Sequence, residues 1–166
     1  MSSEIPVVGL AGFSNSGKTT FLEKLIVELK SRGYLIGVIK HSHHRVDIDE
    51  PGTDTWRHTQ AGADVVALAA PGSISMVKKC QDDPLPEQVI SMFSGVDLII
   101  IEGYKRGKWP KIEVFQPGAA ERPNISPTEL LAVVCDEQPN PGSAPCLGFN
   151  DIAKAADLVE KTVLGR

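Results

Sequence analysis

The sequence predicts a three-layer α/β fold of the P-loop NTPase class, a mostly parallel sheet with helices on both faces. Runs of consecutive aliphatic residues alternate with segments of helical periodicity, which is typical of buried parallel strands. A glycine-rich loop joins the first of these runs to the first helical segment, as nucleotide-binding proteins require. At 166 residues the chain has the length of one domain, so residues 1–166 are expected to form a single nucleotide-binding domain.

The first half of the chain carries two apolar strands, two helices and a hairpin. Residues 5–11 and 34–40 are continuous apolar runs, and apolar residues at helical spacing join the glycine-rich loop to a cap at Gly33. Thr53 or Asp54 is the expected N-cap of a short helix that runs to about Gly62. Strands are expected at 64–70 and 74–78, and the Pro71-Gly72 turn between them predicts an antiparallel hairpin.

The second half repeats the alternation of helix and strand. A helix is expected from Pro86 to about Phe93, followed by the most apolar strand, 96–101. Residues 111–115 alternate in and out like a half-buried strand, and 130–134 form the last clear strand. Asn150 or Asp151 caps a final amphipathic helix.

The net charge, the N-terminal residues and the cysteines limit which partners and which cellular location are expected for this chain. The balance of 17 basic and 21 acidic residues gives a net charge of −4, which argues against nucleic acid as the main partner. Residues 1–4 lack the features of a signal peptide, and no apolar run reaches membrane-spanning length. Cys80, Cys135 and Cys146 form no Cys-x-x-Cys pair, which favours reduced thiols and a cytoplasmic location.

Residues 12–19 match the phosphate-binding pattern G-x-x-x-x-G-K-[ST] at every fixed position. The glycines let the loop wrap tightly, so that backbone N–H groups converge on phosphate oxygens. Lys18 is expected to reach the β- and γ-phosphates, and the hydroxyl of Thr19 to bind Mg²⁺. The alternative is a chance Gly/Ser-rich turn between a strand and a helix.

Polar residues follow the other apolar strands, and ligands of parallel sheets bind at the carboxyl ends of strands. The segments 12–19, 40–49 and 102–105, together with Asp136, are therefore expected to face one crevice. Glu102 would hold a water molecule on Mg²⁺, unless it is a solvated strand end.

Two further groups of residues are open to two interpretations each. Asp47 and Asp49 would approach the metal or orient a water for hydrolysis, or they belong to a solvated turn. His41, His43 and His44 would bind zinc or nickel, or His41 and Lys40 would contact phosphate or a partner.

Asp136 and the basic loop after Glu102 are the remaining candidates. Asp136 would accept hydrogen bonds from N1–H and the 2-amino group of guanine, or it is a turn-forming residue. The loop 104–110 is basic and aromatic, so it would grip an anionic ligand or a partner, or be solvated with Trp109 packed down.

Several of these segments together resemble the MobB family, the molybdopterin-guanine dinucleotide biosynthesis adapter proteins. The resemblance covers most of the chain, and its most specific parts are a histidine loop leading into Asp-x-Asp-x-Pro-Gly and the motif Glu-Gly-Tyr-Lys. The segments that carry it are 12–20, 40–44, 47–55, 57–58 with 61–63, and 97–105 followed by 111–113.

The resemblance implies a GTP-binding homodimer with Mg²⁺ and weak GTPase activity. It implies that the chain assists the guanylyltransferase that joins GMP to molybdopterin; contact with molybdopterin itself is left open. Carried over by position, phosphate would be bound by Ser14, Asn15, Ser16, Gly17, Lys18, Thr19 and Thr20. Thr19 and Glu102 would serve Mg²⁺, Asp49 would act near both the metal and the γ-phosphate, and Asp136 would read guanine. Lys18 and Asp49 are then the expected catalytic residues.

Two other functions are compatible with the same loop. A small-molecule kinase would need an acceptor pocket and a closing lid, for which the loops 104–110 and 116–128 are candidates. A metallochaperone GTPase would use His41, His43 and His44 to bind its metal.

Overall fold

The computed structural model describes residues 4–104, 107–115, 124–136 and 144–166. The chain divides into two compact units. Unit 1 comprises Met1–His41 and Pro86–Arg166, and unit 2 comprises Ser42–Leu85.

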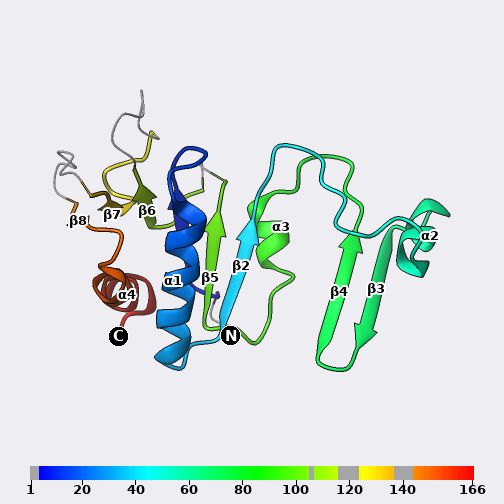
Figure 1. Ribbon diagram of the computed structural model, residues 1–166, viewed down its shortest axis with the longest axis horizontal. Coiled ribbons are helices and arrows are strands. Elements are labelled where there is room, and N and C mark those ends of the chain that lie inside the picture. The colour runs from blue at the N-terminus through cyan, green and yellow to red at the C-terminus, as the bar shows by residue number, and fades with distance from the viewer. Residues whose placement is uncertain (1–3, 105–106, 116–123, 137–143) are drawn as a thin grey trace. The chain divides into compact units, whose positions relative to one another are not determined.

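Unit 1 is built on a six-stranded sheet in the order β2-β5-β1-β6-β7-β8, and every strand pair in it is parallel (Figure 1). The apolar strands β1 and β5 lie in the interior of the sheet, where both of their faces are covered. The strands are β1 (Val7–Ala11), β2 (Ile36–Lys40), β5 (Leu98–Glu102), β6 (Lys111–Val114), β7 (Leu130–Val134) and β8 (Cys146–Leu147).

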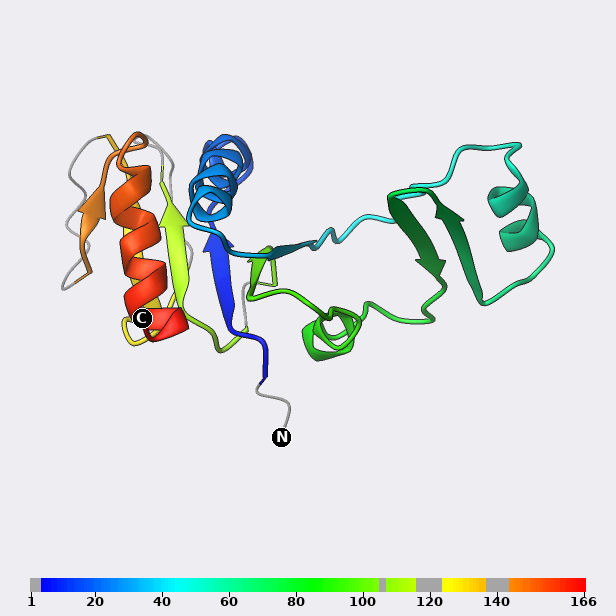
Figure 2. The same cartoon turned by 90° about the horizontal axis from the view of Figure 1, so that it is seen from below.

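Helices cover both faces of this sheet. Helix α1 (Lys18–Ser31) and helix α4 (Ile152–Val159) lie side by side on one face, and α3 (Pro86–Ile90) lies on the other (Figure 2). Helix α4 continues into a π-helical turn, η1 (Glu160–Leu164). The main core lies under α1 and α4, where Phe21, Leu25 and Leu29 meet the sheet.

Arg32, directly after α1, connects this helix to α4 and η1. Its guanidinium pairs with Asp157 at 2.7 Å, with Glu160 at 2.6 Å and with Glu28 at 2.8 Å. The hydrogen bonds to Asp157 and then Glu28 raise the pKa of Arg32 further above its ordinary value, so the charge is permanent.

Unit 2 contains helix α2 (Asp54–Gln60) and an antiparallel hairpin of β3 (Val65–Ala70) and β4 (Ser73–Lys78). Thr53 caps α2 by accepting a hydrogen bond from the backbone N–H of Trp56 at 3.3 Å. The turn between the strands places Gly72 at φ 82°, in the left-handed region that glycine adopts without strain. One face of the hairpin carries five exposed apolar side chains: Val65, Ala67, Ala69, Ile74 and Met76.

The predicted fold class is confirmed: a parallel sheet with helices on both faces and an added antiparallel hairpin. The strand 111–115 was wrongly expected to be half exposed. The structure places β6 between β1 and β7, so both Lys111 and Glu113 are 1% exposed. Lys111 is tolerated there because its ammonium pairs with Glu129 at 2.7 Å and donates to the carbonyl of Trp109 at 3.1 Å.

Two further elements differ from the sequence expectation. Helix α3 ends at Ile90, short of the predicted Phe93, and the short edge strand β8 was not predicted. Two residues give too little alternation for a strand signal, and β8 exists because β7 supplies its hydrogen bonds. Among the described residues, no helix combines the length and apolar character needed to cross a bilayer.

Candidate functional site

The loop between β1 and α1 has the geometry that its glycines permit. Gly12 adopts φ 151° and Gly17 adopts φ 86°, both in the range that favours glycine. A Cβ atom on Gly12 would lie 2.4 Å from the carbonyl oxygen of Val114 and 2.8 Å from Oγ of Ser16. The two glycines of the sequence pattern are therefore required by backbone conformation, and Gly12 also by space.

Ser16 lies inside this loop. Its side chain is 5% exposed, and within the described residues its hydroxyl has no hydrogen-bond partner. A buried hydroxyl without a partner is unfavourable, so a ligand oxygen at this position would satisfy it. The backbone N–H of Ser16, unlike its hydroxyl, has a partner. It donates to the carbonyl of Phe13 at 3.3 Å and closes a turn over Ser14 and Asn15.

The start of α1 offers further donors. Its hydrogen-bond ladder begins with the N–H of Phe21 donating to the carbonyl of Gly17 at 3.0 Å. The N–H groups of the first turn precede this ladder and carry the positive end of the helix dipole, which favours an anion. Thr19 and Thr20 are exposed in this turn, and the ammonium of Lys18 bends back over the loop to the carbonyl of Phe13.

Glu102 ends the strand next to the loop. It lies opposite Leu10 on β1 and Lys40 on β2, and its carboxylate is paired with the ammonium of Lys40. The side chain of Glu102 is buried, and the ion pair compensates the charge. By strand alternation its side chain shares the face of Leu98 and Ile100, which is the face covered by α1.

A tight turn follows Glu102 and contacts His41. The rings of His41 and Tyr104 stack with centroids 3.9 Å apart, and the N–H of His41 donates to the carbonyl of Glu102 at 2.9 Å. A Cβ on Gly103 would lie 2.8 Å from Cβ of His41, so this approach requires glycine. His41 thus packs within unit 1, whereas His43 and His44 are exposed residues of unit 2.

Asp136 follows β7 and is exposed. Its Oδ1 accepts a long hydrogen bond, 3.4 Å, from the N–H of Phe149. Phe149 was not among the residues predicted from the sequence, because an isolated aromatic residue before a helix has no motif of its own. A Cβ on Gly17 would lie 2.8 Å from Cε1 of Phe149, so the ring contacts the glycine that caps α1.

The segment 148–151 that carries Phe149 is held in place by hydrogen bonds. Oδ2 of Asp151 accepts from the N–H of Gly148 at 2.9 Å, and Oδ1 pairs with Lys154 at 2.9 Å. The bond from Lys154 first, and then that from Gly148, lowers the pKa of Asp151 below its ordinary value. Lys24 of α1 donates to Oδ1 of Asn150 at 3.0 Å.

Asp49 belongs to unit 2 and organises the turn before α2. Its Oδ1 accepts hydrogen bonds from the N–H of Glu50 at 3.0 Å and from the hydroxyls of Thr53 at 3.1 Å and Thr55 at 3.0 Å. Asp47 is exposed in the same unit. The roles of Asp49 in catalysis and metal binding stay predictions.

The basic and aromatic loop is described in part, since Lys105 and Arg106 lie outside the described residues. Trp109 packs against the second hydrophobic cluster of unit 1, as expected if the loop is solvated with its tryptophan packed down. A Cβ on Gly9 of β1 would lie 2.5 Å from Nε1 of Trp109, and the ammonium of Lys111 lies 5.8 Å from the ring centroid.

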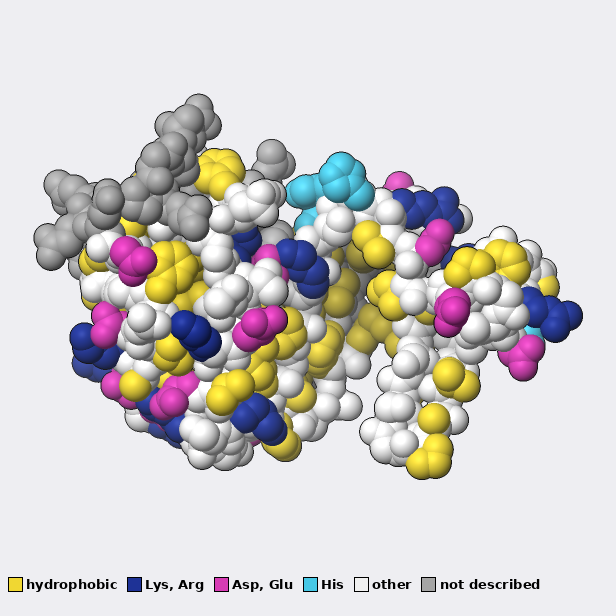
Figure 3. All heavy atoms as spheres, in the orientation of Figure 1, with side chains coloured by type: hydrophobic (Ala, Val, Ile, Leu, Met, Phe, Trp, Pro, Cys, Tyr) yellow, Lys and Arg dark blue, Asp and Glu magenta, His cyan; other side chains and the backbone are white. Residues whose placement is uncertain are grey.

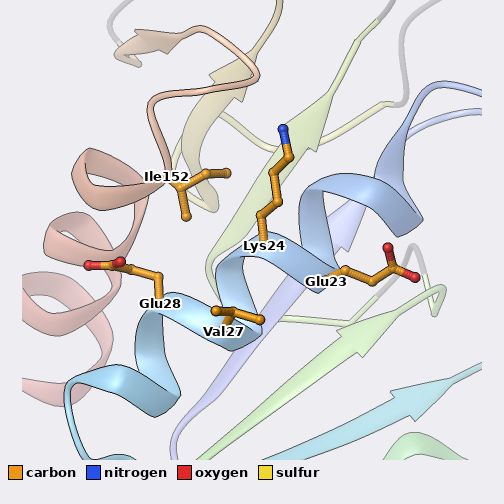
Figure 4. A pocket seen from close by; sticks show the side chains of 5 residues that line it. All are labelled: Glu23, Lys24, Val27, Glu28 and Ile152. Atoms are coloured by element: carbon orange, nitrogen blue, oxygen red, sulfur yellow. The ribbon is translucent and has the colours of Figure 1, made fainter.

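A shallow groove lies elsewhere on unit 1, along α1 and the start of α4. Its volume is about 330 Å³, and its lining residues come from α1 except for Ile152 (Figure 4). Around it, basic and acidic side chains alternate on this face, which presents no field of one sign (Figure 3). The lining of the groove includes one cation, Lys24, beside two carboxylates, Glu23 and Glu28, so it does not favour an anion as the start of α1 does. Its lining residues are Glu23, Lys24, Val27, Glu28 and Ile152.

Four of the predicted site segments thus meet at one edge of unit 1. The loop after β1, Lys40 and His41 after β2, Glu102 to Tyr104 after β5 and Asp136 after β7 all follow parallel strands at their carboxyl ends. Residues 42–49 belong to unit 2.

The same segments match a known family. The profile of MobB, described as molybdopterin guanine dinucleotide synthesis protein B, matches residues 7–136. The chain belongs to the MobB family. The match spans the phosphate-binding loop, the histidine segment, Glu102 and Asp136.

MobB relatives from two bacteria match nearly the whole chain. The molybdopterin-guanine dinucleotide biosynthesis adapter protein of Haemophilus influenzae is 35% identical, over 96% of this chain and 90% of that protein. The protein of the same name from Escherichia coli is 35% identical, over 93% of this chain and 91% of that protein. The crystal structure of MobB from Bacillus subtilis superimposes with a TM-score of 0.76 at 27% identity, covering 97% of this chain and 99% of that one.

Proposed function

We propose that this chain is a GTP-binding adapter that assists the attachment of GMP to molybdopterin. Membership of the MobB family and the names of the bacterial relatives support the pathway. The observation that carries nucleotide binding is the loop between β1 and α1, in which the buried hydroxyl of Ser16 has no partner in the described structure. Cys80, Cys135 and Cys146 are not joined by disulfide bonds in the described structure, which is compatible with the cytoplasmic location that we propose.

In this proposal the triphosphate lies on the segment Ser14–Thr20. Lys18 exchanges its bond to the carbonyl of Phe13 for phosphate oxygens, which are charged and therefore stronger acceptors. The hydroxyl of Thr19 and the carboxylate of Glu102 are oxygen donors of the kind that Mg²⁺ prefers, so the residues present fit this ion. Mg²⁺ would neutralise phosphate charge, with Glu102 acting through a water while its Oε1 stays paired with Lys40.

We propose that hydrolysis of GTP is slow. Asp49 is the candidate for orienting the attacking water, but three hydrogen bonds to one of its oxygens fix it in its own turn. Its other oxygen, Oδ2, is buried and has no partner in the described residues, so it retains the capacity to accept from water. A slow enzyme suits an adapter whose bound state must persist. Hydrolysis at the rates typical of kinases would contradict this.

The chain is proposed to act as a homodimer. The hairpin of unit 2 supports this, because Ile74 is 78% exposed and Val65 and Met76 are each 50% exposed on one face. An apolar face of this kind favours association. Light scattering should give twice the mass of one chain, and Ile74→Asp with Met76→Asp should yield monomers. Retention of the dimer in that double variant would remove the hairpin from the interface.

The adapter function is tested with the guanylyltransferase of the same organism. Addition of this chain with GTP and Mg²⁺ should raise the rate of guanine dinucleotide formation from molybdopterin, and the two proteins should co-elute. The variant Lys18→Ala is the matched control and should fold but give no stimulation. Equal stimulation by both proteins would separate the adapter role from nucleotide binding.

A further inference from the structure

Phe149 occupies the junction between the phosphate-binding loop and the strand end that carries Asp136. Its N–H donates to Oδ1 of Asp136 at 3.4 Å, and its ring lies against Gly17, the N-cap of α1. These two contacts connect Phe149 to the residue proposed to read the base and to the loop proposed to hold the phosphates.

The ring has one side on the core and another that is accessible. Phe149 is partly buried and packs on the main hydrophobic cluster of unit 1. The backbone beneath it is fixed, because Gly148 and Asp151 exchange two hydrogen bonds, 2.9 and 3.0 Å, and Asn150 is held by Lys24 at 3.0 Å. A rigid aromatic surface of this kind loses little entropy when a flat ligand stacks on it.

We propose that Phe149 contacts the nucleoside half of the bound nucleotide, with the segment Gly148–Asp151 as its support. This inference rests on the proposed function, since it assumes that the triphosphate lies on the neighbouring loop. A nucleoside joined to phosphates at the start of α1 begins within reach of the ring that touches Gly17. Asp136, bonded to the Phe149 backbone through Oδ1, keeps its second oxygen for donors on the base.

A purely structural role would also explain the contact with Gly17, and the two roles predict different ligand dependence. Were Phe149 only a support of the loop, its loss would weaken every ligand that the loop binds. As a nucleoside contact, its loss weakens GTP and leaves inorganic tripolyphosphate unaffected. Tripolyphosphate is therefore the decisive probe.

The experiment is a calorimetric titration of the full chain with GTP and with tripolyphosphate, each with Mg²⁺. Stacking of a base on an aromatic side chain predicts that Phe149→Ala lowers the affinity for GTP about tenfold. The affinity for tripolyphosphate should stay within twofold of the wild type. Phe149→Tyr keeps the ring and should bind GTP within twofold of the wild type.

The controls separate this inference from the proposed function. Lys18→Ala should lose both ligands, because its contact is to phosphate. Equal losses of GTP and tripolyphosphate in Phe149→Ala, or no loss of either, would overturn this inference alone. Failure of the wild type to bind either ligand would overturn the proposed function with it. Phe149→Leu fills the space beside Gly17 without an aromatic face, so it should show the same selective loss even if Phe149→Ala folds poorly.

Discussion

Unit 1 and unit 2 differ in how much of their apolar surface each one buries. In unit 1 the strand β5 is buried along its whole length, and Phe21, Leu25 and Leu29 of α1 are 0% exposed. In unit 2 the only buried residue among those described is Val66, at 8% exposure, while Ile74 stands 78% exposed. Unit 1 thus has a core of its own, and the hairpin of unit 2 has an apolar face without a cover inside its unit.

In the proposed function, this difference separates the nucleotide-binding loop from the proposed dimer surface. The phosphate-binding loop belongs to the unit with the core, where rigid elements fix its geometry, as a preorganised site requires. The exposed hairpin belongs to unit 2, and in the proposed dimer a second chain would cover its apolar face. Four predictions test this division and the interactions that stabilise unit 1, in order of decreasing effect.

The largest effect is expected from truncating the core of unit 1. Leu25→Ala should lower the free energy of unfolding by about 4 kcal/mol, because it leaves a cavity at a fully buried position. Ile74→Ala in unit 2 should change the stability of the monomer by less than about 0.5 kcal/mol. Urea denaturation over a range of protein concentrations measures both. Equal losses of unfolding free energy in the two variants at low protein concentration would contradict the claim that only unit 1 has a buried core.

Lys111 tests whether a charge in the core of unit 1 is structural. Lys111→Ala should cost about 3 kcal/mol, since it leaves Glu129 and two carbonyls without their buried partner. Lys154→Ala is the control: this lysine is 68% exposed, so solvent screens its pair with Asp151 and its loss should have little effect on stability. Thermal unfolding monitored by circular dichroism compares them, and a neutral Lys111→Ala would show that the pair is dispensable.

Ion pairs on the surface should contribute less to stability than Lys111 does. Among them, the pairs of unit 1 should contribute more than the pair of unit 2. Arg32→Ala removes three ion pairs between α1, α4 and η1 and should cost about 1 kcal/mol, with a smaller cost at high salt. Arg57→Ala in unit 2 removes one pair of 3.8 Å to Asp54 and should be neutral. A salt-independent loss in Arg32→Ala would point to packing of its aliphatic stem instead.

The smallest effect concerns pH and the segment under Phe149. The pKa of Asp151 is lowered from the ordinary 3.8, so its carboxylate stabilises the segment above that pH. The stabilisation is lost as the pH falls through the lowered pKa, because the protonated group no longer pairs with Lys154. The NMR shift of the Gly148 N–H should follow this titration, and it should be flat in Asp151→Asn. A titration midpoint of Asp151 above 3.8 would mean that its pKa is raised, which contradicts a stabilising carboxylate.

The sequence predicted those parts of the molecule that depend on local chemistry. The glycine-rich loop, the Thr53 cap and the Pro71-Gly72 hairpin each follow from the conformations that their own residues permit. The parallel character of the main sheet was also predicted, because continuous aliphatic runs need cover on both faces. The prediction of one nucleotide-binding domain over 1–166 stays a prediction.

What the sequence missed depends on neighbours distant in the chain. The alternation of Lys111, Ile112 and Glu113 resembles an exposed strand until β1 and β7 are known to flank it. Phe149 gains its place only when the segment before α4 meets Asp136 and Gly17. Asp49 was interpreted from its chemistry alone, whereas its threonine partners determine its geometry.

The most direct test of the account is a calorimetric titration of the wild-type chain and of Lys18→Ala with GTP and Mg²⁺. One GTP should bind per wild-type chain, ATP should bind more weakly, and binding to Lys18→Ala should be undetectable at an unchanged melting temperature. Unchanged GTP affinity in Lys18→Ala would contradict it, since the triphosphate would then lie away from the loop between β1 and α1.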